Sequence, residues 1–429
     1  MARSEQAKRL GTVKTPVAIY IVHHPECKEA EELSATLYDW FRLGYLSGDS
    51  SGAGLPVYFR RQICDGRTPE ERGAGATPQW AEFPTIQADK AELTVIIVLV
   101  DHRMVVDPTW RAAIVALSQR VAAGQLRHDD RTASVELLPA ALHDSFYRTG
   151  PLYGCFNPVR LMGLSKPAQV ATLRRAATEM TARLLRNSSG NSFRPLDVFL
   201  SHAKKDGTAI AEFLRDGIRR FGQLQAWYDT NDLPFGKAWE KRMRASATEV
   251  TASMVSVVTD AYPTRPWCRQ ETRLARTPRR LKAPKNTRVW RLQPMVAVHH
   301  PQLSWVRAIP MLEGVPRIGW DPYNPIDHTE LVVDRLVLEM MLSYVHQRVA
   351  KDLDRRDGRD EETCFITWVP DSWTLAKLRH LLEEEGDARK VKTIVYPGYG
   401  LTPAEIDDLE PAIKGFTPET ELKSFEDYL

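Results

Sequence analysis

The stretch that decides the fold runs from Leu196 to Leu274. It opens with the run Leu196-Asp197-Val198-Phe199-Leu200-Ser201-His202-Ala203-Lys204-Lys205-Asp206. Further along it contains Ala226-Trp227-Tyr228-Asp229, Asp232-Leu233-Pro234-Phe235-Gly236, Ser253-Met254-Val255-Ser256-Val257-Val258-Thr259 and Arg265-Pro266-Trp267-Cys268-Arg269-Gln270-Glu271. Short apolar runs that break into small and polar residues are typical of buried strands that end in loops. The stretch therefore predicts strands of a parallel sheet.

The elements around this stretch alternate between strand and helix. We expect strands at 197–201, near Trp227, at 253–259 and at 295–298. The expected helices cover 208–221, 237–248, the residues around Glu271, and 329–345. Alternating strands and helices of this length predict a parallel, doubly wound α/β sheet of the flavodoxin-like kind.

The residues before this stretch follow the same pattern. Strands are expected at 17–22, 55–59 and 93–100, helices at 33–41, 110–121 and 168–185, and surface segments at 65–84 and 187–192. The run 93–100 is apolar throughout, which suits the centre of a parallel sheet covered on both faces. These features predict an α/β domain over residues 1–190 and a second one over 191–350.

The last part of the chain predicts a small α/β tail, residues 351–429. The charged run 351–362 is interpreted as a boundary. Strands at 364–369 and 393–396 then alternate with a helix at 372–385 and a helix that opens at Thr402 with a capping-box pattern. A segment of roughly 70 residues is small for an independent core, so we expect it to pack on a neighbouring domain.

Composition excludes several classes of protein. The 429 residues are 43% hydrophobic and 26% charged, with a net charge of +3, so no nucleic acid or membrane partner is implied. The longest apolar run, 93–100, is too short to span a bilayer, and the first ten residues do not resemble a signal peptide. Five cysteines without a CxxC pair argue against a disulfide framework. We expect a cytoplasmic protein.

Residues 1–190 and the central domain share an order of features. Ile19-Tyr20-Ile21-Val22-His23-His24 parallels Val198-Phe199-Leu200-Ser201-His202, and the run 95–101 parallels 254–260. Trp110 then corresponds to Trp267, but Ile114 stands where Glu271 would be. Either the first domain is a copy that lacks the carboxylate, with a structural or sensing role, or any two doubly wound domains look this similar.

The polar residues of the central domain gather where ligands bind. Open α/β sheets bind ligands beyond the carboxyl ends of their strands, and Ser201 and His202 end the first strand there. The loop with Asp229, Leu233 and Gly236 leaves the second strand near the same edge. Trp267 and Glu271 are four residues apart, which places them on one face of a helix. An indole beside a carboxylate suits cleavage of a glycosidic bond through an oxocarbenium-like transition state.

The stretch resembles the bacterial branch of the TIR (Toll/interleukin-1 receptor) family over about 150 of the 429 residues. Asp197 to Asp206 resembles the family's opening box D-V-F-I-S-H-A-x-x-D, with Leu200 in place of Ile. Asp232 to Gly236 resembles its BB loop, and Trp267 to Glu271 matches its Trp-x-x-x-Glu pattern. The first domain and the tail do not carry these boxes.

The resemblance implies cleavage of NAD⁺ at the nicotinamide–ribose bond, with NAD⁺ as substrate and no cofactor. It implies that Glu271 is the catalytic residue and contacts the ribose, and that Trp267 flanks the nicotinamide. Phe199, Ser201 and His202 would lie near the nucleotide. Two Val-His-His-Pro tetrapeptides, at 22–25 and 298–301, lack further ligands at suitable spacing, so no metal site is expected.

The expected function is that of an immune effector in anti-phage defence, or of an enzyme that produces an ADP-ribose-type signal. Water as acceptor would give ADP-ribose, and a position on the same molecule would give a cyclic product. Activity is expected to require self-association, with an activating protein or nucleotide as the trigger. Two alternatives stay open. One is a non-enzymatic TIR scaffold that assembles proteins, and the other is a related α/β enzyme that acts on nucleosides.

The segment from Arg273 to Arg291 contains eight basic residues and no acidic one. Such a run is usually a solvated face, although contact with phosphate or nucleic acid is the alternative, which we do not favour. The acidic stretch 383–387 is a candidate to pair with it across a self-assembly contact.

Overall fold

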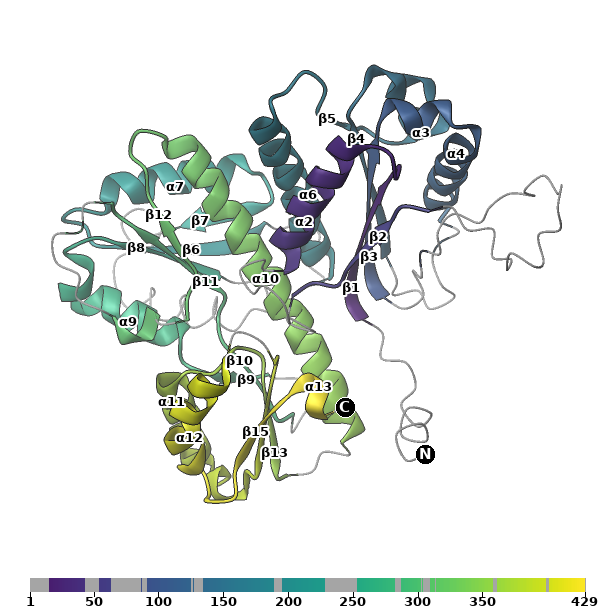
Figure 1. The fold of residues 1–429 in the computed structure, drawn as a ribbon. Helices are drawn as coiled ribbons and strands as arrows, with labels where there is room; N and C mark the ends of the chain where they lie inside the picture. Colours follow the sequence, from purple (N-terminus) through teal and green to yellow (C-terminus); the bar gives the residue numbers. More distant parts are fainter. Residues whose placement is uncertain are drawn as a thin grey trace, which may run out of the picture. The chain divides into compact units, whose positions relative to one another are not determined.

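The computed structural model describes residues 15–42, 54–62, 86, 91–124, 126, 134–188, 195–227, 253–281, 287–301, 303, 309–312, 314–357, 361–398 and 401–428. These residues form three five-stranded sheets flanked by helices (Figure 1). Contacts divide the chain into two compact units. The first comprises residues 1–50 and 54–177, and the second residues 51–53 and 178–429. The chain is thus a mixed α/β protein, as the sequence predicts.

The first unit contains a parallel sheet in the order β2-β1-β3-β4-β5. Its strands are β1 (Thr15–His23), β2 (Val57–Arg60), β3 (Ala91–Val100), β4 (Ser134–Ala141) and β5 (Val159–Arg160). Its helices are α2 (Lys28–Arg42), α3 (His102–Val106), α4 (Pro108–Ala122), α5 (Pro151–Cys155) and the start of α6 (Lys166–Ser188). The apolar strand β3 lies in the middle of the sheet, as its doubly apolar sequence predicts.

The second unit begins with another parallel sheet, in the order β12-β11-β8-β6-β7. Its strands are β6 (Leu196–His202), β7 (Leu224–Trp227), β8 (Ser253–Val258), β11 (Met295–His299) and β12 (Arg317–Gly319). The helices that follow its first and third strands are α7 (Thr208–Arg220) and α9 (Pro266–Ala275). From β6 the chain moves outward to β7 and then crosses to β8 on the other side. The carboxyl edge between β6 and β8 is therefore the switch point at which such sheets bind ligands.

Both sheets share this strand order, second-first-third-fourth-fifth. Residues 1–190 and the central domain therefore share their sheet topology as well as an order of sequence features. It is also the order of flavodoxin-like sheets in general. The TIR-like assignment of residues 1–190 therefore stays a prediction.

The third sheet joins the end of the chain to a segment from the middle. Its order is β15-β14-β13-β10-β9, in which β13 (Thr363–Ile366), β14 (Thr393–Tyr396) and β15 (Glu421–Ser424) come from the C-terminal residues. The other two strands, β9 (Arg279–Arg280) and β10 (Val289–Arg291), lie in sequence between α9 and β11. The remaining helices are α10 (Pro325–Arg356), α11 (Ser372–Glu385), α12 (Pro403–Lys414) and α13 (Phe425–Tyr428).

Helix α10 continues through the start of the charged run that we interpreted as a boundary. It extends as far as Arg356, because Ala350, Leu353 and Asp354 are buried and hold this part of the helix against the third sheet. The charged residues of this run therefore lie on both sides of the helix, with Asp354 buried and Arg355 and Arg356 exposed. The tail packs on its neighbour as expected, and it does so by sharing strands with it.

Arg288 is the centre of the junction between the inserted strands and the C-terminal residues. Its guanidinium donates to the carboxylates of Asp354 at 3.1 Å and Asp357 at 3.0 Å, and to the carbonyl of Thr363 at 3.1 Å. Asp354 is 1% exposed, so this ion pair is shielded from water. Three hydrogen bonds thus join the segment before β10 to the end of α10 and to β13.

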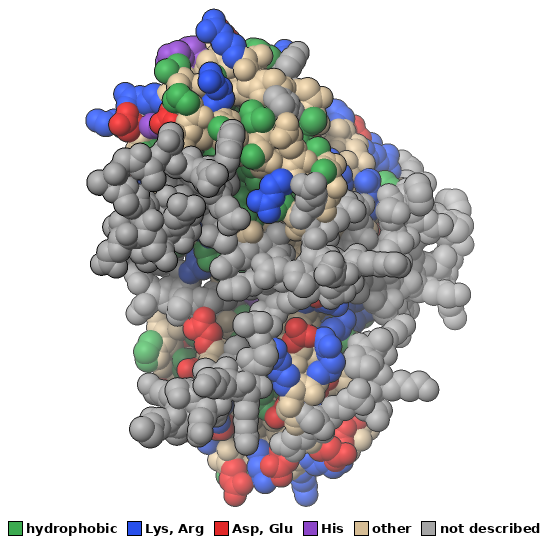
Figure 2. All heavy atoms as spheres, turned by 90° about the vertical axis from the view of Figure 1, so that its right-hand side faces the viewer, with side chains coloured by type: hydrophobic (Ala, Val, Ile, Leu, Met, Phe, Trp, Pro, Cys, Tyr) green, Lys and Arg blue, Asp and Glu red, His purple; other side chains and the backbone are tan. Residues whose placement is uncertain are grey.

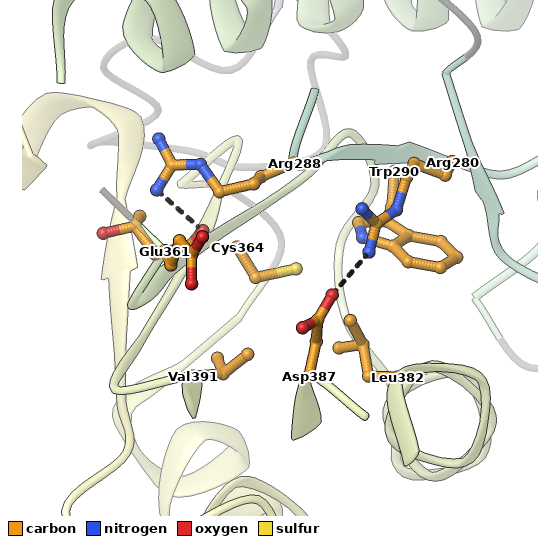
Figure 3. A pocket seen from close by; sticks show the side chains of 9 residues that line it. Arg280, Arg288, Trp290, Glu361, Cys364, Leu382, Asp387 and Val391 are labelled. Carbon is orange, nitrogen blue, oxygen red and sulfur yellow. Dashed lines mark hydrogen bonds and ion pairs between the residues drawn. The ribbon is translucent and has the colours of Figure 1, made fainter. Parts of the chain in front are cut away.

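Arg280 makes a second junction on the same sheet. It lies over the Trp290 ring, with 5.0 Å to the centroid, and pairs with Glu385 and Asp387 at the end of α11. Figure 3 shows both arginines around a cavity of about 280 Å³ whose floor includes Cys364, Leu382 and Val391. Cations are favoured at the C-terminal end of a helix, which suits the position of Arg280.

The basic segment 273–291 therefore has structural partners within the chain. Its arginines Arg276, Arg280 and Arg288 are ion-paired and Arg291 is buried. Two residues of the acidic stretch 383–387, Glu385 and Asp387, pair with Arg280 within the chain. Figure 2 shows Lys and Arg side chains near Asp and Glu side chains on the face it draws, in keeping with a net charge of only +3.

We predict that Arg288→Ala destabilises the third sheet, because it leaves the buried Asp354 carboxylate without its cation. Breaking a buried pair in this way costs about 3–5 kcal/mol of unfolding free energy. Urea denaturation followed by tryptophan fluorescence measures the loss, and the exposed Arg389→Ala should stay within about 0.5 kcal/mol of the wild type. Equal stability of the two variants would contradict the role of Arg288.

Candidate functional site

The carboxyl edge between β6 and β8 brings a serine, a tyrosine and a glutamate together. Ser201 in β6 donates its hydroxyl hydrogen to Oε2 of Glu271, on α9, at 2.5 Å. The Tyr262 hydroxyl, from the 3₁₀ turn Tyr262–Thr264 after β8, lies 2.8 Å from Ser201 Oγ. All three residues are buried. The structure thus unites two predicted site residues, Ser201 and Glu271, at the predicted edge of the sheet.

The hydroxyl network continues from Tyr262 back into α9. Tyr262 Oη lies 3.0 Å from Thr272 Oγ1, and Thr272 donates to the Cys268 carbonyl at 2.9 Å. Burial raises the pKa of Tyr262, and the nearby Glu271 raises it further. The phenol therefore stays protonated at physiological pH and keeps its hydrogen available for these bonds.

Helix α9 turns Glu271 toward the sheet and Trp267 toward solvent. Its buried residues are Cys268, Glu271, Thr272 and Ala275. Glu271 is 8% exposed, whereas Trp267, one turn earlier, is 58% exposed. Trp267 and Glu271 lie on neighbouring turns of α9, as the spacing predicts, but the glutamate is buried and the tryptophan is exposed. An indole this exposed presents a face on which a flat ring can stack.

Two other predicted substrate residues lie beneath this edge. Phe199 is 2% exposed, and its ring centroid lies 4.6 Å from that of Trp227 within the core. The backbone carbonyl of His202 accepts a bond from the Cys268 thiol at 3.4 Å. Burial raises the pKa of Cys268 to about 12, helped by the charge of Glu271. The thiol therefore stays protonated, which suits a structural role.

The remaining predicted residues, Asp229, Leu233 and Gly236, lie outside the described residues. The box residue Asp206 has a clear local role. Its carboxylate accepts bonds from Thr259 Oγ1 at 2.6 Å and from the Ala261 amide at 2.9 Å. It thereby ties the loop after β6 to the loop after β8, on the two sides of the switch point.

Sequence reasoning missed Tyr262 and Thr272. Tyr262 lies four residues after the end of β8, at the edge where ligands bind. A polar aromatic residue in the turn that follows a fully buried strand is a usable signal for it. Thr272 follows Glu271 on the buried side of α9, where a hydroxyl requires a hydrogen-bond partner.

The C-terminal end of α9 is anchored to the third sheet's helix α11. Arg276, the residue after α9, donates to the Asp371 carboxylate at 2.5 Å, and both side chains are largely buried. Burial lowers the pKa of Arg276, and Asp371 opposes this shift. Asp371 also caps α11 by accepting a bond from the Thr374 amide at 2.8 Å. One carboxylate therefore fixes both helices.

Within the described ranges, no group of three or more His, Cys, Asp or Glu side chains is arranged to hold a metal ion. A search of the same ranges found no helix with the length and hydropathy to cross a membrane. The described site comprises one carboxylate, three hydroxyls and an exposed indole.

We expect Asp371→Asn to loosen α9 while α11 keeps its cap, since asparagine is an equally good N-cap residue. The loss of the charge facing Arg276 should lower the unfolding free energy by about 1–3 kcal/mol. Hydrogen exchange of the α9 amides should quicken more than that of the α7 amides. The control is Glu384→Gln, which removes an exposed ion pair with His380 on α11. It should change the unfolding free energy and the exchange rates little. Unchanged exchange in α9 would refute the anchor.

Comparison with known proteins gives one family. The TIR domain family model matches residues 198–314. No curated protein matches the chain. Ser201, Tyr262 and Glu271 all lie within the residues that match this family.

Two solved structures are similar over most of their length, at low identity. The C-terminal domain of glucosamine-fructose-6-phosphate aminotransferase from Francisella tularensis is 9% identical, with a TM-score of 0.20, over 82% of this chain and 88% of that one. Tagatose-6-phosphate ketose/aldose isomerase from Escherichia coli is 11% identical, with a TM-score of 0.19, over 79% and 83%. Scores this low carry no argument about fold or function. The family match stands on its own, and it shows a TIR domain within this chain, at residues 198–314.

Proposed function

We propose that the TIR domain cleaves NAD⁺ at the nicotinamide–ribose bond, with Glu271 as the catalytic carboxylate. The observation that carries the proposal is the Glu271–Ser201 hydrogen bond of 2.5 Å at the carboxyl edge between β6 and β8. A carboxylate held at the ligand-binding edge of an open α/β sheet is placed to meet a bound nucleotide. The presence of a TIR domain supports this reading, and it also fits a scaffold.

The chemistry requires stabilisation of positive charge on the ribose. When the C–N bond breaks, its electron pair leaves with the pyridinium nitrogen, and neutral nicotinamide departs. Positive charge then develops on the ribosyl carbon and ring oxygen, as in other glycosidic cleavages. Water adds to this carbon and loses a proton, which gives ADP-ribose, whereas addition of a nitrogen from the same molecule gives a cyclic product.

The residues of this chain match those requirements. Glu271 provides negative charge in a water-poor setting, where fixed charges act strongly on a transition state. Ser201 holds Oε2 and so limits rotation of the carboxylate. The exposed indole of Trp267 supplies a stacking surface for the nicotinamide ring at the entrance to the site.

The first unit lacks this arrangement at the corresponding place. Ile114 is 1% exposed where the parallel predicts the carboxylate, and Trp110 is 5% exposed, in contrast to Trp267. The Trp110 ring packs 5.5 Å from that of His24. We therefore propose one active site per chain, with the first unit as a structural or sensing copy.

The biological role that follows is that of an anti-phage effector which depletes NAD⁺ or produces an ADP-ribose-type signal. Self-association, which is common among TIR domains, would then control activity, and a protein or nucleotide trigger would promote it. A rate of NAD⁺ cleavage that rises more steeply than protein concentration is the expected sign of such control.

We predict that Glu271→Gln lowers nicotinamide release at least about 100-fold, because the amide keeps the shape and loses the charge. Free nicotinamide is followed by chromatography over a wide range of protein concentrations and with candidate triggers. The control is Glu212→Gln, an exposed residue of α7 in the same domain. It should retain the wild-type rate.

Equal rates for wild type and Glu271→Gln would remove Glu271 from its role. Intact NAD⁺ under every condition would overturn the enzyme proposal. The scaffold alternative would then be the better reading of the TIR domain.

A further inference from the structure

We infer that Tyr262 is a positioning residue for Glu271 and that it acts through Ser201. The inference rests on the proposed function of Glu271 and adds a residue to its mechanism. Tyr262 is 0% exposed, and its hydroxyl lies 2.8 Å from Ser201 Oγ, which in turn donates to Glu271 at 2.5 Å. A single chain of two hydrogen bonds therefore links the phenol to the carboxylate.

The number of hydrogens decides the direction of this chain. A serine hydroxyl has one hydrogen, and Ser201 gives it to Glu271. Toward Tyr262, Ser201 can then only accept, so the phenol is the donor. Thr272 is in the same situation, because its hydrogen goes to the Cys268 carbonyl. The phenol hydrogen faces the oxygens of Ser201 and Thr272, and the shorter of these contacts is the one to Ser201. The Ser256 hydroxyl also lies near the phenol and has its own hydrogen to donate.

The bond from Tyr262 restricts the serine. The serine hydroxyl hydrogen can rotate about the Cβ–Oγ bond, and a donor on the oxygen favours the direction in which this hydrogen points at Glu271. Accepting a hydrogen bond also strengthens the bond that the hydroxyl donates, since hydrogen bonds in a chain polarise one another. Tyr262 therefore fixes both the direction and the strength of the Ser201–Glu271 bond.

Packing alone does not require the phenol oxygen. The Tyr262 ring belongs to an apolar cluster with Phe199, Met254 and Cys268, which a phenylalanine would also suit. A buried hydroxyl costs free energy unless it is hydrogen-bonded. Its place beside Ser201 accounts for the oxygen through its effect on the carboxylate.

The test is a double-mutant cycle with Tyr262→Phe and Ser201→Ala, read out as nicotinamide release. Tyr262→Phe alone should lower kcat about tenfold, the value of one hydrogen bond, with KM nearly unchanged. In the Ser201→Ala background the same substitution should have no further effect, because Tyr262 acts only through Ser201. An equal loss in both backgrounds would overturn the inference and leave Tyr262 a packing residue.

A second cycle does not depend on activity. The losses of unfolding free energy caused by the two substitutions should be non-additive, since both break the same hydrogen bond. Additive losses would overturn the link between Tyr262 and Ser201. Wild-type protein that leaves NAD⁺ intact would instead overturn the proposed function, and this second cycle would still report on the hydrogen bond.

Discussion

The buried carboxylate of Glu271 is the constraint on which the rest of the TIR domain depends. An ionised carboxyl group is costly to remove from water unless other groups donate to it. Ser201 supplies a donor from a strand 70 residues earlier in the chain. The two residues meet because the sheet places β6 beside β8, and because α9, which follows β8, packs against the carboxyl end of β6. The strand order and the crossover from β7 to β8 therefore determine that Ser201 and Glu271 meet.

The third sheet takes part in the same arrangement. The chain leaves α9 and enters β9 and β10 of the third sheet before it returns to β11 of the TIR sheet. Arg276 joins the end of α9 to Asp371, and Arg288 joins the segment before β10 to Asp354. The third sheet is thus tied to the helix that carries Glu271 by the chain connection from α9 to β9 and by the Arg276–Asp371 ion pair. A displacement of α11 would therefore act directly on the end of α9, through the Arg276–Asp371 ion pair.

Local pattern was enough to predict most elements and part of the site. The helix 372–385 and the capping box at Thr402 follow from short-range signals and are confirmed. The proximity of Ser201 and Glu271 followed from the rule that ligand-binding residues gather at the carboxyl ends of parallel strands. The sequence did not predict strands β9 and β10, because two or three residues show no periodicity and the pairing of β10 with β13 is long-range. The arginines of 273–291 were read as a surface, since a charge pattern does not reveal the carboxylates that pair with it.

The central claim is that one bond of NAD⁺ breaks at one site. A proton NMR time course of NAD⁺ with the wild-type protein tests it most directly, because each possible cleavage gives different nicotinamide and ribose signals. Free nicotinamide should appear together with an equal amount of an ADP-ribosyl product. Cleavage at the pyrophosphate, with nicotinamide still attached to its ribose, would contradict it.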